Sequence, residues 1–360
     1  MKIKRLALLI ALLLLLGTLN GCAARGGAAD VHVFYYTYSD TYISTVRSAL
    51  DAKLKDAGIR YQDYDSNNSQ TTQTEQVQTA ITKGAKLLIV NIVTTGSDDA
   101  ASGIVTLAKN AGIPVIFFNR EVSDAVVNSY DKCVFVGTDA AEAGYLQGDM
   151  IGNYVVENYD KIDLNGDGTI SYVMFMGEKG NNEAIYRTRY SVENADKKLA
   201  AAGKPALSFY DPANTDKYLL DREGKWSARA ANEYMTTILA SYSSANRNMI
   251  ELVICNNDGM AEGAISALIA AGHNKGTSDG ITIPVFGVDA TSAAKELIRA
   301  GKMAGTIKQD AEGMAEAIKD IAENVLEGDP MLDDMDDYNV DAGVAKVRIA
   351  YAVYLGKDSD

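Results

Sequence analysis

The strongest constraint on the fold is the regular alternation of short apolar segments with longer amphipathic segments along the chain. The apolar segments are continuous and rich in Val, Ile and Phe, which is typical of parallel strands that are covered on both faces. Segments between them, such as 41–57 and 140–156, have helical periodicity. The alternation therefore predicts an α/β fold of doubly wound parallel sheets. The apolar segments include 31–38, 86–93, 114–118, 133–137, 170–176, 251–256 and 284–288.

The N-terminus has the layout of a bacterial export signal. Basic residues precede an apolar run at 6–16, which is shorter than the roughly 18–20 residues of a membrane-spanning helix. The run leads into a Leu-Asn-Gly-Cys ending that is typical of a lipoprotein cleavage site. We therefore expect a signal peptide at 1–21, lipidation of Cys22 and a tether at 22–30. An ordinary secretory peptide with an incidental cysteine is the alternative.

Length, cysteine content and charge narrow the class of protein. Removal of the signal leaves 339 residues, more than one hydrophobic core usually serves, so two domains are expected. Cys133 and Cys255 lie in apolar segments and are expected to be buried free thiols, with a disulfide between them as the alternative. The net charge of −14 disfavours nucleic acid and anionic lipid as partners. The N-terminal lipid is then the only expected contact with a membrane.

Polar side chains come at the ends of several predicted strands. In doubly wound sheets, ligands bind beyond the carboxyl ends of the strands. A phosphate site would use Gly-rich loops, and neither G-x-G-x-x-G nor a Walker sequence occurs. Carboxylates and amides instead suit a neutral ligand with many hydroxyl groups, although such residues are also common in loops. The residues concerned are Asp40, Asn119, Asn257, Asp258, Asp289, Gln309 and Asp310.

Residues 163–171, DLNGDGTIS, match the first nine positions of an EF-hand calcium loop. The position of the usual bidentate Glu is occupied by Met174, and a strand is predicted where a second helix would begin. Glu251 opens another predicted strand and can supply the carboxylate if the two strands are neighbours. We expect a structural Ca²⁺, with a metal-free turn as the alternative. The expected ligands are Asp163, Asn165, Asp167, Thr169 through its carbonyl, Ser171 and Glu251.

The calcium loop and five further motifs make the chain resemble the bacterial periplasmic glucose/galactose-binding proteins. The resemblance extends from the first predicted strand to the last. In that family the calcium loop also takes a remote Glu as a ligand. The resemblance implies a type I periplasmic binding protein fold, with two doubly wound lobes joined by a three-strand hinge. The motifs are YSDTY at 38–42, FFNRE at 117–121, VGTDAAEAG at 136–144, CNNDGMAEGA at 255–264 and PVFGVDA at 284–290.

The resemblance implies that the chain passes between the lobes three times, so that each lobe is discontinuous in sequence. We expect the crossings near 137–139, 309–310 and 346–349. The expected N-terminal lobe comprises 31–136 and 311–346. The expected C-terminal lobe comprises 140–308 and 349–358 and includes the loop at 163–171.

The resemblance also implies a sugar site. Asp40 matches the carboxylate that binds the hydroxyl group by which glucose and galactose differ. Tyr42, in place of a Phe, and Trp226 match two aromatic rings that enclose the sugar ring. Packing of Trp226 on a helix surface beside Lys225 is the alternative. The other matching positions are Asn119, Arg187, Asn257 and Asp289.

Three positions depart from the family pattern. Asn181 stands in place of His, Glu183 in place of Asp, and Gln309 in place of Asn. Each keeps hydrogen-bonding capacity but changes its reach or removes an imidazole. A badly matched buried hydroxyl costs roughly 1–3 kcal/mol, or one to two decades in affinity. D-glucose or D-galactose is expected as the ligand, with xylose or another aldose as the alternative.

Together these features predict a monomeric binding protein outside the cytoplasm, lipid-anchored or periplasmic, that delivers a monosaccharide to an ABC permease and is read by a chemoreceptor. A sugar-acting enzyme is disfavoured because the only histidines are His32 and His273 and no nucleophile elbow or zinc-protease motif occurs. A sugar-responsive repressor would begin with a helix-turn-helix, where this chain has an export signal. A sensory lipoprotein without a transport role stays open.

Overall fold

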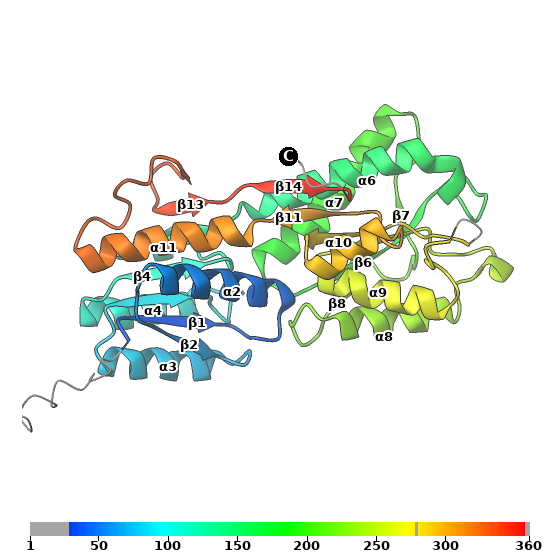
Figure 1. Cartoon of the computed structure of the whole chain (residues 1–360). Coiled ribbons are helices and arrows are strands. Elements are labelled where there is room, and N and C mark those ends of the chain that lie inside the picture. The colour runs from blue at the N-terminus through cyan, green and yellow to red at the C-terminus, as the bar shows by residue number, and fades with distance from the viewer. Residues whose placement is uncertain (1–28, 278–279, 357–360) are drawn as a thin grey trace, which may run out of the picture.

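The computed structural model describes residues 29–277 and 280–356. The predicted signal peptide, Cys22 and residues 23–28 of the tether lie outside the described residues. Figure 1 shows two lobes side by side, each built around its own sheet. Within the described part of the chain, no helix is both long enough and apolar enough to cross a membrane.

The sheet of the N-terminal lobe has seven strands in the order β12-β13-β5-β4-β3-β1-β2. Its apolar segments are buried on both faces: Val33 and Ile89 pack with α2 and α11, whereas Phe34 and Leu88 pack with α3 and α4. The strands are β1 (Val31–Tyr35), β2 (Tyr61–Asp65), β3 (Leu87–Val90), β4 (Val115–Phe118), β5 (Cys133–Gly137), β12 (Asn339–Val340) and β13 (Lys346–Arg348). The helices are α2 (Thr41–Asp56), α3 (Gln70–Thr82), α4 (Asp99–Ala111), α5 (Asp124–Val127) and α11 (Ala311–Glu327).

The second sheet has the order β14-β11-β10-β9-β6-β7, with β8 also paired to β6. One face is covered by α8, α9 and α10 and the other by α6 and α7. The strands are β6 (Ser171–Met176), β7 (Ser208–Phe209), β8 (Leu219–Leu220), β9 (Leu252–Cys255), β10 (Val285–Asp289), β11 (Gly305–Gln309) and β14 (Tyr351–Tyr354). The helices are α6 (Ala140–Ile162), α7 (Asn182–Ala201), α8 (Ala228–Leu239), the 3₁₀ turn η1 (Ser244–Asn246), α9 (Asp258–Ala270) and α10 (Ser292–Arg299).

The chain passes between the lobes at three points. It leaves β5 for α6 through residues 138–139, leaves β11 for α11 through Asp310, and leaves β13 for β14 through 349–350. The predicted two-lobed α/β architecture is confirmed, but the sheets are not wholly parallel. The pairs β12–β13 and β11–β14 are antiparallel. The β11–β14 pair must be antiparallel because β11 ends at a crossing and β14 begins at one.

Both cysteines in the described chain, Cys133 and Cys255, are free and buried, as predicted. Burial raises the pKa of the Cys133 thiol to about 12 and also raises that of Cys255. The lobes are therefore held together by the crossing segments and by non-covalent contacts.

Candidate functional site

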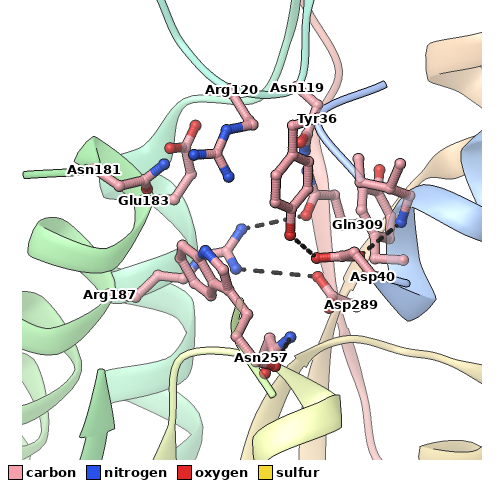
Figure 2. Close-up of a pocket in the computed structure, with 13 residues that line it drawn as sticks. Tyr36, Asp40, Asn119, Arg120, Asn181, Glu183, Arg187, Asn257, Asp289 and Gln309 are labelled. Atoms are coloured by element: carbon pink, nitrogen blue, oxygen red, sulfur yellow. Dashed lines mark hydrogen bonds and ion pairs between the residues drawn. The ribbon is translucent and has the colours of Figure 1, made fainter. Parts of the chain in front are cut away.

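A pocket of about 360 Å³, measured with its opening, lies between the lobes at the carboxyl ends of the strands. All ten ligand-binding residues predicted from the sequence line it, and they come from both lobes (Figure 2). Three further residues, Tyr36, Ile43 and Arg120, also line the pocket.

Three of the candidate residues are held by a second role as helix N-caps. The Asp40 carboxylate accepts a hydrogen bond from the backbone N–H of Ile43 at 2.8 Å and begins α2. Asn181 and Asn257 begin α7 and α9 in the same way. Asp and Asn are preferred at this position because the side-chain oxygen satisfies a free N–H of the first turn. The local sequence thus places all three side chains where the helices meet the pocket.

Asp40 is further oriented by Tyr36, whose hydroxyl donates to Oδ2 at 2.6 Å. The Arg120 guanidinium lies 4.2 Å from the centre of the Tyr36 ring, a cation–π distance. Tyr36 lies in the apolar segment 31–38 and was not among the predicted site residues. Arg120 is adjacent to Asn119 in FFNRE, and this adjacency was the signal that could have identified it.

Three candidate residues have backbone conformations that non-glycine residues rarely adopt. Asn119, Trp226 and Asp289 have φ angles of 61°, 54° and 121°. Such conformations are strained and persist where the surrounding structure enforces them, most often at functional sites. The strain observed here therefore supports the assignment of a binding site.

Trp226 lies against the pocket and not on an outer helix surface. The indole is 8% exposed and packs on Gly177, where a Cβ atom would come within 2.1 Å of the ring. Only glycine leaves room for the ring at that position. Asn257 Nδ2 donates to the Trp226 carbonyl at 3.2 Å and fixes the backbone that carries the ring.

Arg187 is one of two buried arginines that line the pocket. It donates through Nη1 to the carbonyl of Asn256 at 2.9 Å, and through Nη2 to Gln309 Oε1 at 3.2 Å and the Tyr351 hydroxyl at 2.8 Å. Its Nη1 lies 4.0 Å from Asp289 Oδ1. Burial raises the pKa of Asp289 well above its ordinary value, and the Arg187 charge opposes this shift.

Several buried polar atoms of the pocket have no hydrogen-bond partner within the described protein. They are both carboxylate oxygens of Glu183, Nε2 of Gln309, the Tyr42 hydroxyl, and Nε of Arg187 and Arg120. Burial raises the pKa of Glu183, opposed chiefly by Arg187. Buried polar groups are costly unless they are hydrogen-bonded. The arrangement can therefore accommodate a ligand that offers several donors and acceptors within a small volume.

The lobes also contact each other directly at the edge of the pocket. Arg120 of the N-terminal lobe forms an ion pair with Glu178 at 2.5 Å, and Thr95 Oγ1 donates to the same carboxylate at 3.2 Å. Trp226 Nε1 points to Glu178 from its own lobe at 3.4 Å. Glu178, which follows β6, was missed from the sequence because its role depends on a contact across the lobes.

The predicted calcium loop folds around Asp163. Its carboxylate accepts hydrogen bonds from the backbone N–H groups of residues 166, 167 and 168 at 2.8–3.2 Å. Gly166 and Gly168 have φ angles of 67° and 75°, which favour glycine. The carboxylate of the fully buried Glu251 accepts from the backbone N–H groups of Asn165 and Ser171, both at 2.8 Å. The remote carboxylate thus lies beside the loop.

In this conformation the loop side chains bond mainly to the protein backbone. Asn165 exchanges two hydrogen bonds with the backbone of Met249, and Ser171 Oγ donates to the Met249 carbonyl at 2.6 Å. Burial raises the pKa of Glu251, and its hydrogen bonds oppose the shift. Across 29–277 and 280–356, no group of three or more His, Cys, Asp and Glu residues is arranged to hold a metal ion. The calcium site stays a prediction.

Comparison with known proteins gives the family. Residues 31–330 match the model of the periplasmic binding protein domain. The chain is 34% identical over 343 residues to the D-galactose/methyl-galactoside binding periplasmic protein MglB of Haemophilus influenzae, covering 94% of this chain and 93% of that protein. The chain therefore belongs to the periplasmic binding protein family. The relatives found are solute-binding proteins and not enzymes, as was predicted for this chain.

Solved structures of solute-binding proteins share the fold. A solute-binding protein of an ABC transporter from Clostridium phytofermentans, with bound β-D-glucose, has a TM-score of 0.68 at 23% identity, over 91% of this chain and 94% of that one. A solute-binding protein from Bacillus halodurans, with bound myo-inositol, has a TM-score of 0.67 at 23% identity, over 92% and 96% of the chains. These matches confirm the fold.

Proposed function

We propose that this protein binds D-glucose or D-galactose outside the cytoplasm and delivers the sugar to an ABC importer. The observation that carries the proposal is the set of unpartnered polar atoms buried between two lobes. A monosaccharide offers hydroxyl donors to Glu183 and hydroxyl acceptors to Gln309 and the arginines. It would satisfy most of these atoms at once.

The aromatic residues of the pocket support a ring-shaped ligand. Tyr42 and Trp226 are 6% and 8% exposed and come from different lobes. The C–H faces of a pyranose are apolar and suit aromatic rings, while its hydroxyl groups radiate at the edge. The pocket brings together three carboxyl groups, from Asp40, Glu183 and Asp289. They outnumber its two guanidinium groups, which gives no excess of positive charge for an anionic ligand.

Binding by contacts from both lobes gives the mechanism. A sugar that touches Asp40 in one lobe and Arg187 in the other is bound more tightly in the closed form than in the open form. Only such a difference in affinity lets a ligand shift a hinge equilibrium. A higher sugar concentration thereby raises the population of the closed form. A permease, and in a second role a chemoreceptor, can recognise that form.

The choice of hexose rests on Asp40 and on the relative from Haemophilus influenzae, whose name refers to D-galactose. Asn181, Glu183 and Gln309 are the positions that would alter this choice. The bound myo-inositol in a structure of the same fold makes another polyol the second candidate.

The test is isothermal titration of the protein from residue 23 onward, with calcium present, against glucose, galactose, xylose, ribose and myo-inositol. Asp40→Asn serves as the matched variant, because Asn keeps the N-cap and removes the charge. Micromolar or tighter binding of glucose or galactose, weakened in Asp40→Asn, supports the proposal. If only xylose, ribose or myo-inositol bound, the proposed choice of ligand would be wrong. Sugar turnover would contradict a transport role.

We also propose that the loop at 163–171 binds a structural Ca²⁺ and that Cys22 carries a lipid. The first proposal is supported by the glycine conformations and by Glu251 beside the loop. Bound calcium would replace backbone hydrogen bonds as the partner of these carboxylates and fix the loop against β9. The second rests on the sequence of the export signal, and the mass of the N-terminal peptide from membranes tests it.

A further inference from the structure

Tyr351 lies at the third crossing between the lobes, as the first residue of β14. It is 6% exposed, and its hydroxyl accepts two hydrogen bonds, both at 2.8 Å. One comes from Nη2 of Arg187 in the pocket. The other comes from Oγ1 of Thr138, which lies in the first crossing.

The second crossing is connected to the same guanidinium. Gln309 is the last residue of β11 before the chain returns to the N-terminal lobe, and its Oε1 accepts from Arg187 Nη2 at 3.2 Å. Arg187 thus contacts two crossings directly and reaches the third through Tyr351. Its Nε is buried and has no hydrogen-bond partner in the described protein.

Thr138 also forms a hydrogen bond with the N-terminal lobe. It is fully buried, and its carbonyl accepts from Nη1 of Arg348 in β13 at 2.7 Å. Arg348 is itself paired with Glu121 and Asp341 of the N-terminal lobe. The hydroxyl of Thr138 therefore faces the C-terminal lobe through Tyr351, while its carbonyl is tied to the N-terminal lobe through Arg348.

We propose that Tyr351 is a positioning residue that couples Arg187 in the pocket to the hinge. It fixes the guanidinium in the orientation that a ligand meets, and it ties that guanidinium to the first crossing through Thr138. A ligand bound to Arg187 then stabilises the closed arrangement of the crossings as well as the contact itself. The role of Arg187 as a ligand-binding residue rests on the function proposed above, whereas the link between Tyr351 and the crossings does not.

The test compares Tyr351→Phe with Tyr354→Phe in the protein from residue 23 onward, which contains all described residues. Both changes remove one hydroxyl from a buried tyrosine of β14, but the Tyr354 hydroxyl has no hydrogen-bond partner in the described protein. Spin labels on Ser48→Cys in α2 and Thr236→Cys in α8 report the distance between the lobes. Both positions are exposed, and the native cysteines are buried.

In Tyr351→Phe we expect about tenfold weaker affinity for the sugar that the unsubstituted protein binds, and an open fraction that persists at saturating sugar. Tyr354→Phe should stay within twofold in affinity and keep the original distance distribution. Thr138→Val breaks the same bond from its other end. The double variant Thr138→Val with Tyr351→Phe should therefore lose less affinity than the product of the two single losses.

Equal affinities and equal distance distributions in the two tyrosine variants would overturn the proposal. If the unsubstituted protein bound neither hexose, the function proposed above would fail. The role of Tyr351 would still be tested, because loss of its bond to Thr138 should broaden the ligand-free distance distribution of Tyr351→Phe relative to Tyr354→Phe, and equal ligand-free distributions would overturn that role. Should Tyr351→Phe fail to fold, as judged by its thermal midpoint, Thr138→Val decides the question alone, because Val has nearly the shape of Thr.

Discussion

Glu183 is the residue at which ligand binding and stability are expected to oppose each other. It is 4% exposed, and neither carboxylate oxygen has a hydrogen-bond partner in the described protein. An unsatisfied buried acceptor costs about 1–3 kcal/mol, and more when it is charged. The replacement Glu183→Gln keeps the shape and removes the charge. It should therefore stabilise the ligand-free protein by about 1 kcal/mol, a rise of ~2–4 °C in the melting temperature.

The same replacement should weaken sugar binding. The Gln carbonyl can still accept from a sugar hydroxyl, so the change loses only the difference between a charged acceptor, about 1.5–3 kcal/mol, and a neutral one, about 0.5–1.5 kcal/mol. This difference should raise the Kd roughly tenfold. Titration calorimetry measures the Kd and scanning calorimetry of the ligand-free protein measures the melting temperature. The matched control is Glu262→Gln, since Glu262 is outside the pocket and already accepts a hydrogen bond from Thr291 at 3.2 Å. It should leave the Kd unchanged.

The raised pKa of Glu183 gives this prediction a second measurement. Because the pKa in the folded, ligand-free protein is raised above the ordinary 4.5, the folded state binds more protons than the unfolded state above that pH. The Glu183 contribution to stability is then lost as the pH rises through the folded pKa. Sugar hydroxyls favour the charged form, so binding should release protons and strengthen with rising pH. Titrations in buffers of different ionisation enthalpy count these protons.

The reasoning would be refuted if Glu183→Gln lowered the melting temperature and left the affinity unchanged. That result would mean that the carboxylate is satisfied in the ligand-free protein and does not contact the ligand.

Three further predictions concern other parts of the molecule. Glu178→Gln removes the charge that Arg120 contacts across the lobes, so the closed form should be less populated and the Kd for sugar should rise severalfold. The enthalpy of unfolding should change little; titration calorimetry measures the Kd and scanning calorimetry measures this enthalpy. Burial and the adjacent Asp51 raise the pKa of Asp63 to about 8, so unfolding experiments should find a free energy that falls by about 1–3 kcal/mol as the pH rises from 5 to 9, and this fall should be much smaller in Asp63→Asn. Chelation of calcium should lower the melting temperature by several degrees, and Glu251→Gln should abolish the difference between chelated and calcium-loaded protein; an unchanged melting temperature on chelation would contradict the calcium proposal.

The two-lobed architecture could be predicted because β-type and helical segments alternate along the chain with clear periodicity. Edge strands such as β12 and β14 could not, since their pairing depends on where the chain crosses between lobes. Asp40 and Asn257 could be predicted as site residues because each is a polar residue that follows a predicted strand. Arg120 and Glu178 could not, because an ion pair between lobes joins residues that are 58 positions apart in sequence.

The requirement for glycine at position 177 also could not be predicted from the sequence. The three atoms nearest to a Cβ placed at this position all belong to the indole of Trp226, which comes from a segment about 50 residues later in the chain. No pattern around Gly177 itself indicates this contact. The sequence therefore predicted the aromatic residue but not the space that it requires.

The use of N-cap residues as pocket residues has a consequence for how binding preference can change in evolution. Asp40, Asn181 and Asn257 each begin a helix, so a substitution there must satisfy the helix before it can suit a new ligand. Only a few side chains, chiefly Ser, Thr, Asp and Asn, cap a helix well. Substitutions at these positions are therefore limited to this set. Glu183 and Gln309 cap no helix, although Gln309 is held by a hydrogen bond from Arg187. At Asn181, where the related family has His, the departure from the family pattern is a side chain that caps α7. A designed library should therefore vary Glu183 first and restrict the three cap positions to side chains that satisfy the helix.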